Sequence, residues 1–160
     1  APSYTITGQT RWALEVLIDA GFTYDSSIFP IKHDLYGMPG AERFPHDITC
    51  ENGVIKEFPP TTIALNISGW KVNLPVAGGG YLRLLPAKWI SAAFSRLNRD
   101  GNPCMLYFHP WEIDPNQPRI RASLKSRFRH YLNLETTEAK LRSLFSRHRF
   151  ASMRSILFEA

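Results

Sequence analysis

Cysteine is scarce in this sequence, with only Cys50 and Cys104 among 160 residues. The two lie far apart, and neither belongs to a Cys-x-x-Cys pair or a Cys/His cluster, the spacings that indicate redox or structural zinc sites. A chain of this length buries roughly two thirds of its unfolded surface, so a hydrophobic core can hold the fold without disulfides. We therefore expect two ordinary buried or half-buried thiols.

Long apolar runs are also lacking. No stretch approaches the roughly 18 to 20 apolar residues that span a bilayer, so the sequence predicts no transmembrane segment. The first residues show no basic region followed by an apolar one, but they do not begin with Met either. The sequence therefore carries no prediction of localisation.

Several binding and catalytic motifs are absent. Gly78-Gly79-Gly80 lacks both the Gly-x-Gly-x-x-Gly spacing and the Lys-Ser/Thr ending of nucleotide-binding loops. No serine lies in a Gly-x-Ser-x-Gly elbow. Four histidines show no metal-ligand spacing, namely His33, His46, His130 and His148. These absences argue against a nucleotide enzyme, an elbow-type serine hydrolase and a metal site built by this chain alone.

Positive charge, in contrast, is in excess: 19 Lys and Arg stand against 14 Asp and Glu, giving a formal net charge of +5. Much of the excess lies between Arg119 and Arg154, where Glu135, Glu138 and apolar helix positions interrupt it. A solvated basic face is the ordinary explanation, and an anionic polysaccharide or lipid surface is the sharper one. The interruptions argue against a nucleic-acid partner.

Periodicity and punctuation predict alternating helices and strands. An amphipathic helix is expected at 10–20, ended by Gly21 and followed by a short strand at 22–25. A long, mostly irregular excursion then runs from Phe29 to Pro60. The other predicted elements are strands at 54–58, 61–67 and 81–85, a helix from 86 to about 97, a buried strand at 104–108, a helix from about 136 to 148, and a closing strand or extended tail at 150–158. This order favours an α/β fold, and part of an α/β barrel over a doubly wound sheet.

Two polar residues follow predicted strands. His109 ends the strand at 104–108, and Asp25 ends the strand at 22–25. In parallel α/β folds such positions face the active site, where a histidine acts as acid or base and a carboxylate orients it. The alternatives, a partly buried structural histidine and an aspartate that only shapes a turn, stay open. The glycine turn at 78–80 is expected to bring Tyr81 and Arg83 close to a groove.

Three segments in order, Ala1–Tyr4, Tyr24–Pro30 and Leu106–Glu112, resemble the third, fourth and fifth motifs of the NodB-like polysaccharide deacetylases, carbohydrate esterase family 4. Their order and approximate spacing agree with that family. Further segments resemble its branch associated with exopolysaccharide production in the exosortase systems of Gram-negative bacteria, namely Glu57–Pro60, Asn73–Leu85 and Phe128–Leu134.

The resemblance implies the C-terminal part of a distorted (β/α)7 NodB-like barrel with long irregular insertions, in which residues from about 115 to 160 form a family-specific extension. In this family one Asp and two His hold a divalent metal, often zinc, and a second Asp is the general base. Those motifs precede the third one, so the resemblance implies a metal bound upstream and none within this chain. The missing N-terminal half of the barrel is then an obligatory partner.

The resemblance also assigns roles to residues of this sequence. His109 resembles the general acid that protonates the departing amine, Asp25 the carboxylate that tunes it, and Leu106 the residue that lines the acetyl pocket. The backbone near Ser3 or Tyr4 resembles the oxyanion donor. Trp111 and Tyr81 are candidates for stacking on sugar rings, and Arg83 joins them as a candidate substrate contact. Since Leu106 and His109 would point to opposite faces of a regular strand, that strand must twist or end before His109.

The implied function is metal-dependent hydrolysis of N-acetyl groups from amino sugars of a bacterial exopolysaccharide. This chain would supply the general-acid half of the site and be inactive alone. Two alternatives are a deacetylase-fold amidohydrolase acting on a small amide and a non-catalytic carbohydrate-binding relative. The aromatic loop from Phe29 to Pro60 favours an N-acetylated polymer as partner. A shared site also predicts that Tyr24–Asp25 and Met105–His109 are neighbours in one parallel sheet.

Overall fold

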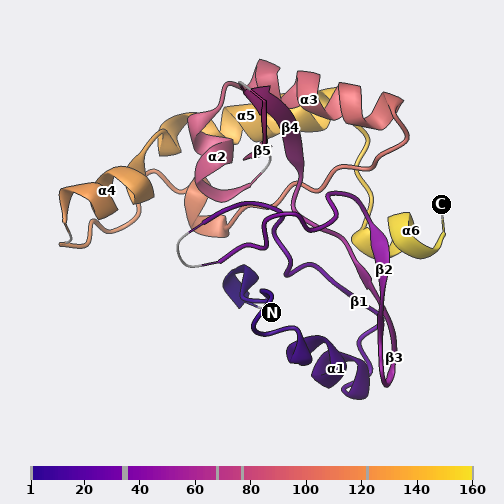
Figure 1. Cartoon of the computed structure of the whole chain (residues 1–160). Coiled ribbons are helices and arrows are strands. Elements are labelled where there is room, and N and C mark those ends of the chain that lie inside the picture. Colours follow the sequence, from indigo (N-terminus) through magenta and orange to yellow (C-terminus); the bar gives the residue numbers. More distant parts are fainter. Residues whose placement is uncertain (1, 34–35, 68, 77, 122, 160) are drawn as a thin grey trace.

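The computed structural model describes residues 2–33, 36–67, 69–76, 78–121 and 123–159, which form a mixed α/β structure with two small sheets (Figure 1). Its elements in chain order are η1 (Pro2–Tyr4), α1 (Trp12–Asp19), β1 (Tyr24–Asp25), β2 (His46–Cys50), β3 (Gly53–Glu57), β4 (Thr62–Ile67), β5 (Trp70–Pro75), α2 (Gly79–Leu84), α3 (Ala87–Arg99), η2 (Pro110–Ile113), α4 (Leu124–Tyr131), α5 (Leu134–Arg147) and α6 (Met153–Phe158). In the described part of the chain, no helix combines the length and the apolar composition needed to cross a bilayer.

The N-terminal layer joins α1 to a three-stranded sheet of order β1-β3-β2. The central strand β3 runs parallel to β1 and antiparallel to β2. Helix α1 ends at Gly21, whose φ of +84° is the left-handed conformation that favours glycine. The core of this layer consists of five buried side chains, Ile6, Leu14, Ile28, Ile48 and Ile55. Burial of this apolar stripe fixes α1 against the sheet.

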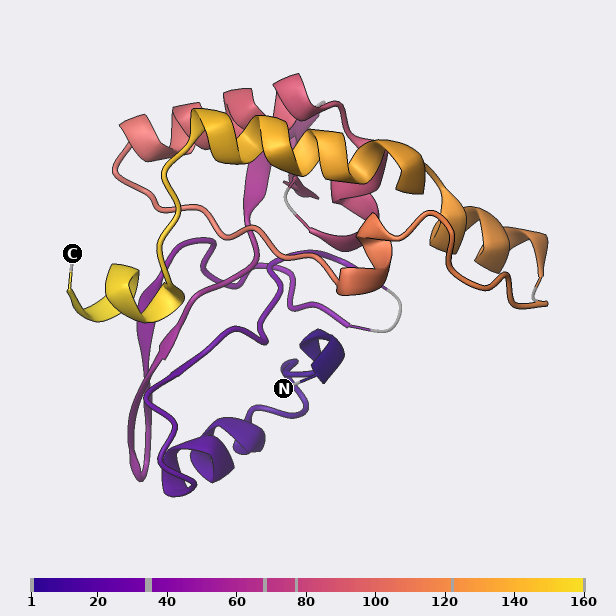
Figure 2. The same ribbon diagram turned by 180° about the vertical axis from the view of Figure 1, so that it is seen from behind.

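The second layer is formed by the long helices α3 and α5, which lie side by side beyond the β4–β5 hairpin (Figures 1 and 2). Pro86 precedes α3, where a missing N–H is harmless because the first helical N–H groups have no intrahelical partner. The core of this layer consists of Val76, Leu82, Ile90, Ala93, Phe94, Leu141 and Leu144. Helix α2 contributes Leu82 to this core and so packs beneath α5.

An extended segment, residues 104–108, runs between the two layers. The Thr61 hydroxyl donates to the Met105 carbonyl oxygen at 2.9 Å and accepts from the Met105 N–H at 2.7 Å. The Ser26 hydroxyl lies 3.7 Å from the Met105 sulfur. Two residues further on, Tyr107 forms an isolated parallel bridge with Gly78. The segment that leads to His109 is therefore held by contacts with both layers.

Several predicted elements are confirmed, since α1, β3, β4, α3 and α5 lie where periodicity placed them. The strand predicted at 81–85 is wrong, because residues 79–84 form the helix α2, which buries Leu82 in the core. The strand or extended tail predicted at 150–158 is also wrong. There Ser152 caps α6 by accepting a hydrogen bond from the Ser155 N–H. No predicted element covers β2, β5 or α4.

The predicted pairing of Tyr24–Asp25 with Met105–His109 is wrong as well. The parallel neighbour of β1 is β3, in the register that places Tyr24 opposite Lys56 and Asp25 opposite Glu57. Residues 104–108 form extended chain, and the described ladders include only the bridge at Tyr107. A strand from the supposedly irregular excursion thus takes the place beside β1. The larger barrel stays a prediction.

Gly78 supplies a first test, because its backbone lies against the Tyr107 ring. Its φ of −177° suits any residue, but an added Cβ would lie 1.8 Å from a ring carbon of Tyr107. We expect Gly78→Ala to lower the free energy of unfolding by about 1 to 3 kcal/mol, measured by urea denaturation. The control is Gly8→Ala, where an added Cβ meets nothing within 4 Å. Equal destabilisation by both substitutions would show that the Tyr107 ring does not occupy this position.

Candidate functional site

The site is built around the turn that follows the extended segment. His109 precedes η2, which begins at Pro110, and the Glu112 N–H donates to the His109 carbonyl oxygen at 2.9 Å. The Glu112 carboxylate returns this contact by accepting from the His109 N–H at 3.0 Å. Glu112 is fully buried, whereas His109 is exposed. The backbone of the turn is thus fixed from the interior while the histidine itself remains accessible.

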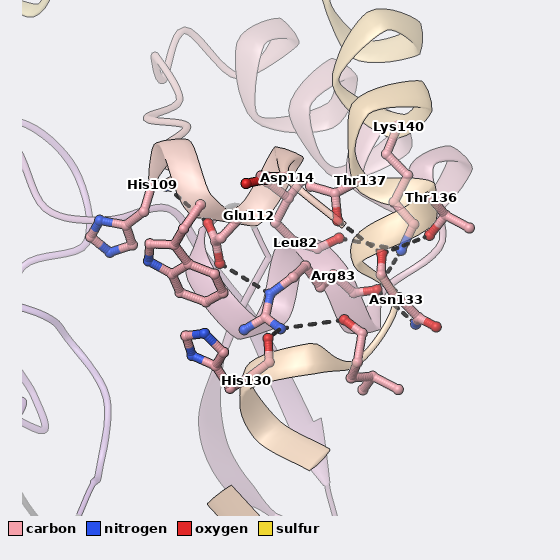
Figure 3. A network of polar contacts seen from close by, with 12 residues as sticks. Leu82, Arg83, His109, Glu112, Asp114, His130, Asn133, Thr136, Thr137 and Lys140 are labelled. Carbon is pink, nitrogen blue, oxygen red and sulfur yellow. Dashed lines mark hydrogen bonds and ion pairs between the residues drawn. The ribbon is translucent and has the colours of Figure 1, made fainter. Parts of the chain in front are cut away.

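A buried ion pair anchors this turn. The second oxygen of the Glu112 carboxylate accepts from Arg83 Nε at 3.1 Å, and both side chains are almost fully buried. The guanidinium also donates through Nη1 to the backbone carbonyl oxygens of His130 and Leu132. Figure 3 shows Arg83 between Glu112 and His130. One side chain therefore joins α2, the His109 turn and the connection between α4 and α5.

Helix α5 closes the same network from its other side (Figure 3). The Asn133 side chain donates to the Arg83 carbonyl oxygen at 3.0 Å. Lys140 donates to the carbonyl oxygens at the end of α2, those of Leu82, Arg83 and Leu85. A cation in this position satisfies carbonyls that have no intrahelical partner. Burial, and then the nearby charge of Arg83, lower the pKa of Lys140.

Five aromatic side chains, Tyr4, Tyr107, His109, Trp111 and His130, form what we call the aromatic row. The Trp111 ring is parallel to His109 with centroids 6.1 Å apart and stacks on His130 at 4.1 Å. The Arg83 guanidinium lies 5.0 Å from the Trp111 centroid, within the range of a cation–π contact. The Trp111 ring thus lies close to three side chains, those of His109, His130 and the buried Arg83.

The other end of the row is a pair of half-buried tyrosines. The rings of Tyr4 and Tyr107 meet edge to face at 5.3 Å. Burial raises the pKa of Tyr107 to about 12 and that of Tyr4 beyond its ordinary range, so both hydroxyls stay protonated near neutral pH. Ser3 and Tyr4 have φ values of +59° and +55°, unusual for residues other than glycine. Strained backbone conformations of this kind cluster at functional sites.

A second polar centre joins Asp25 and Glu57, which the register of β1 and β3 places side by side. Glu57 is fully buried, and one of its oxygens accepts from the N–H groups of Ser27 and Ile28 at 3.1 and 3.0 Å. Burial raises the pKa of Glu57 to about 8, and the charge of Asp25 adds to the increase. The Ser27 hydroxyl donates to Asp25 at 2.9 Å.

The structure brings together only part of the predicted site. Tyr4, His109 and Trp111 lie in the aromatic row, and Tyr81 is half-buried in α2. Asp25 lies instead with Glu57, and no described hydrogen bond joins Asp25 to His109.

Leu106 and Arg83 lie in other surroundings. Leu106 is partly buried and packs against the core of the second layer. Arg83 is only 4% exposed and pairs with Glu112, so its described contacts position the turn, and its contact with a substrate stays a prediction. Ser3, the remaining predicted contact, is exposed in η1.

Glu57 and Glu112 were not singled out by the sequence reasoning. Glu112 follows His109 by three residues, a spacing that allows a carboxylate to return to the backbone N–H of a turn. No sequence pattern indicates a role for Glu57, which is identified only because the register of β1 and β3 places it opposite Asp25. Among the described residues, no group of three or more His, Cys, Asp or Glu side chains could hold a metal ion.

The pKa of Glu57 makes stability depend on pH. Folded Glu57 keeps its proton up to about pH 8, whereas the unfolded side chain loses it near 4.5. The contribution of Glu57 to stability is therefore fully present below pH 4.5 and is lost as pH rises through 8. Relative to Glu57→Gln, we expect the unfolding free energy to fall by up to about 1.4 kcal/mol per pH unit in this window. Exposed Glu51→Gln is the control, and parallel pH profiles for all three proteins would contradict the assignment.

The Arg83–Glu112 pair predicts strong energetic coupling. Arg83→Met or Glu112→Gln alone leaves a buried group without its partner, so each should lower the unfolding free energy by roughly 3 to 5 kcal/mol. The double variant should lose less than the sum by about 0.5 to 3 kcal/mol, measured as a double-mutant cycle in urea. The exposed Arg142–Glu138 pair is the matched control, expected to couple by about 0.5 kcal/mol or less. Additive losses at Arg83 and Glu112 would contradict the network.

Comparison with known proteins adds a family but no function. No curated protein and no solved structure matches the chain significantly. The family model described as "Domain of unknown function (DUF3473)" matches residues 26–158. Domains of this family are found in polysaccharide deacetylase-associated proteins. Because the match covers most of the chain, including the His109 turn and its buried network, the chain belongs to the DUF3473 family.

Proposed function

We propose that this chain is the C-terminal part of a polysaccharide deacetylase that removes N-acetyl groups from amino sugars of a bacterial exopolysaccharide. One observation carries the proposal: an accessible histidine, His109, stands on a turn that the buried pair of Arg83 and Glu112 fixes from behind. The motif resemblance and the occurrence of the family in deacetylase-associated proteins support it.

The proposal includes a larger fold, the distorted (β/α)7 NodB-like barrel. In the three-stranded sheet, β1 is an outer strand whose single described neighbour is the parallel strand β3. Further parallel strands from the missing N-terminal half would extend the sheet at that side. Residues from about 115 to 160 form the proposed family-specific extension, and this part supplies the His130 carbonyl and Lys140 to the network.

His109 is proposed to act as general acid. An amine leaves a tetrahedral intermediate poorly unless it is protonated, and an imidazole is the side chain that exchanges protons near neutral pH. A positioned acid gains roughly a hundredfold or more in rate. The hydrogen bonds to Glu112 hold the His109 backbone, and the Trp111 ring lies parallel to the imidazole.

The chain is proposed to supply only this proton-donating half. Deacetylases of the resembling family use a divalent metal, which polarises the acetamide and activates water when bound. The motif order of the resembling family is our ground for assigning the metal and the general base to the upstream half. Tuning of His109 by Asp25 stays a prediction, since the described neighbours of Asp25 are Ser27 and Glu57.

Acetate release tests the proposal. The full-length protein should deacetylate an N-acetylglucosamine-containing polymer in a metal-dependent way, and His109→Ala should lower turnover roughly a hundredfold or more. The matched control is His46→Ala on β2, whose ring bonds only the Phe44 carbonyl oxygen among described contacts. An aryl acetate ester, whose leaving group needs no proton, should be hydrolysed by His109→Ala with a much smaller loss.

Other outcomes separate the alternatives. Unchanged polymer turnover in His109→Ala would remove this residue from the acid role. Retention of the polymer without acetate release would favour the non-catalytic carbohydrate-binding relative. Hydrolysis confined to small amides would favour the amidohydrolase.

A further inference from the structure

The segment 115–134, which we call the basic segment, carries the whole net charge of the protein. It contains five cationic residues, Arg119, Arg121, Lys125, Arg127 and Arg129, and no Asp or Glu. The formal charge of the entire chain is also +5, from 19 cations and 14 anions, so the remaining residues contribute 14 of each and sum to zero. The excess of positive charge is thus confined to this segment. A basic surface that is merely solvated would not need its charges to be concentrated in one segment.

The same segment exposes large apolar side chains. Ile120, Leu124 and Phe128 are 70%, 82% and 64% exposed. Leu124 and Phe128 stand four residues apart and so share one face of α4. Figures 1 and 2, seen from opposite sides, both place α4 at an extremity of the molecule, beyond the start of α5. Apolar side chains at such a projecting position are accessible to a large flat partner.

The basic segment is folded and its contacts hold the two kinds of side chain together. Ser123 caps α4 by accepting from the Ser126 N–H, and the Tyr131 hydroxyl accepts from the Ile120 N–H at 2.9 Å. The Arg119 guanidinium lies 4.2 Å from the Tyr131 centroid. A shallow pocket is lined by Arg119, Leu124, Arg127, Phe128, Tyr131 and Leu132. Aliphatic, aromatic and guanidinium groups therefore line the same pocket.

The positive charges of this segment are not neutralised within the described structure. Arg119, Arg121, Arg127 and Arg129 form no ion pair with any described carboxylate. By contrast, Arg142 of the neighbouring α5 pairs with Glu138 one turn away. An external anionic partner would therefore be attracted by these four arginines.

We propose that the basic segment docks the protein on a membrane surface that contains acidic phospholipid. Guanidinium groups suit lipid phosphates, and protruding Leu, Ile and Phe side chains enter the boundary between headgroups and acyl chains. An acidic polysaccharide offers the negative charge but no apolar layer that would cover Leu124 and Ile120. Because α4 has only eight residues, binding is shallow, reversible and sensitive to salt. This inference does not depend on the proposed deacetylase activity.

Vesicle sedimentation with the full-length protein tests the proposal. Binding to vesicles containing about one third phosphatidylglycerol should exceed binding to pure phosphatidylcholine at least tenfold, and it should fall as salt is added. Leu124→Ser with Phe128→Ser, and separately Arg121→Glu with Arg127→Glu, should each weaken binding about tenfold. Matched controls on α3, Trp89→Ser and Arg99→Glu, change equally exposed residues and should bind like the unaltered protein.

Three outcomes would overturn the proposal. Equal binding to phosphatidylglycerol-containing and to pure phosphatidylcholine vesicles would show that charge plays no role. Unchanged binding by both double variants would show that the basic segment is not the docking surface. Retention on polygalacturonate without binding to anionic vesicles would identify a polymer as the partner. Circular dichroism and urea midpoints of each variant, compared with those of the controls, show that a loss of binding does not come from unfolding.

Discussion

The candidate site depends on one buried ion pair, formed by Arg83 and Glu112. Two charges removed from water lose hydration, so such a pair contributes little net stability unless its remaining donors and acceptors are satisfied. Here the carboxylate also accepts the His109 N–H, and the guanidinium also donates to two carbonyl oxygens before α5. What the pair provides is geometry, because moving any of the three segments leaves a buried charge without a partner. Helix α5 reinforces this arrangement when Lys140 and Asn133 bind the end of α2.

Elements whose signals are local could be predicted from the sequence. Helices α1 and α3 combine an apolar period with punctuation by Gly21 and Pro86, and these patterns need no knowledge of distant residues. The helix α2 was mistaken for a strand because three glycines at 78–80 indicated only a turn. The spatial reason for Gly78 is contact with the ring of Tyr107, which is far away in sequence. The prediction of the strand beside β1 was wrong for the same reason. The pairing and register of β1 with β3 depend on contacts between residues that are far apart in sequence.

The candidate site shows the same division. His109 and Trp111 were predicted together because only Pro110 separates them, and their rings are parallel in the structure. The partner of Glu112 lies 29 residues upstream, so sequence reasoning assigned Arg83 to a substrate and left Glu112 without a role. Alternation along an extended segment predicts different surroundings for Leu106 and His109, and Leu106 is partly buried against the core whereas His109 is exposed. His109 and Trp111 could be predicted because they are close in sequence. The Arg83–Glu112 pair could not, because it joins residues that are far apart in sequence.

The aromatic row around His109 and the basic segment are physically continuous. His130 belongs to the last turn of α4, its ring stacks on Trp111, and its carbonyl oxygen accepts from Arg83. The buried guanidinium therefore holds the end of the basic segment and the turn that carries His109 at the same time. Short contacts of this kind leave little freedom between α4 and the turn, because a shift of either breaks hydrogen bonds to a buried charge. A membrane bound at Leu124 and Phe128 would accordingly fix the orientation of His109 relative to the bilayer through a rigid connection, and a polymer would have to approach from the side that α4 leaves open.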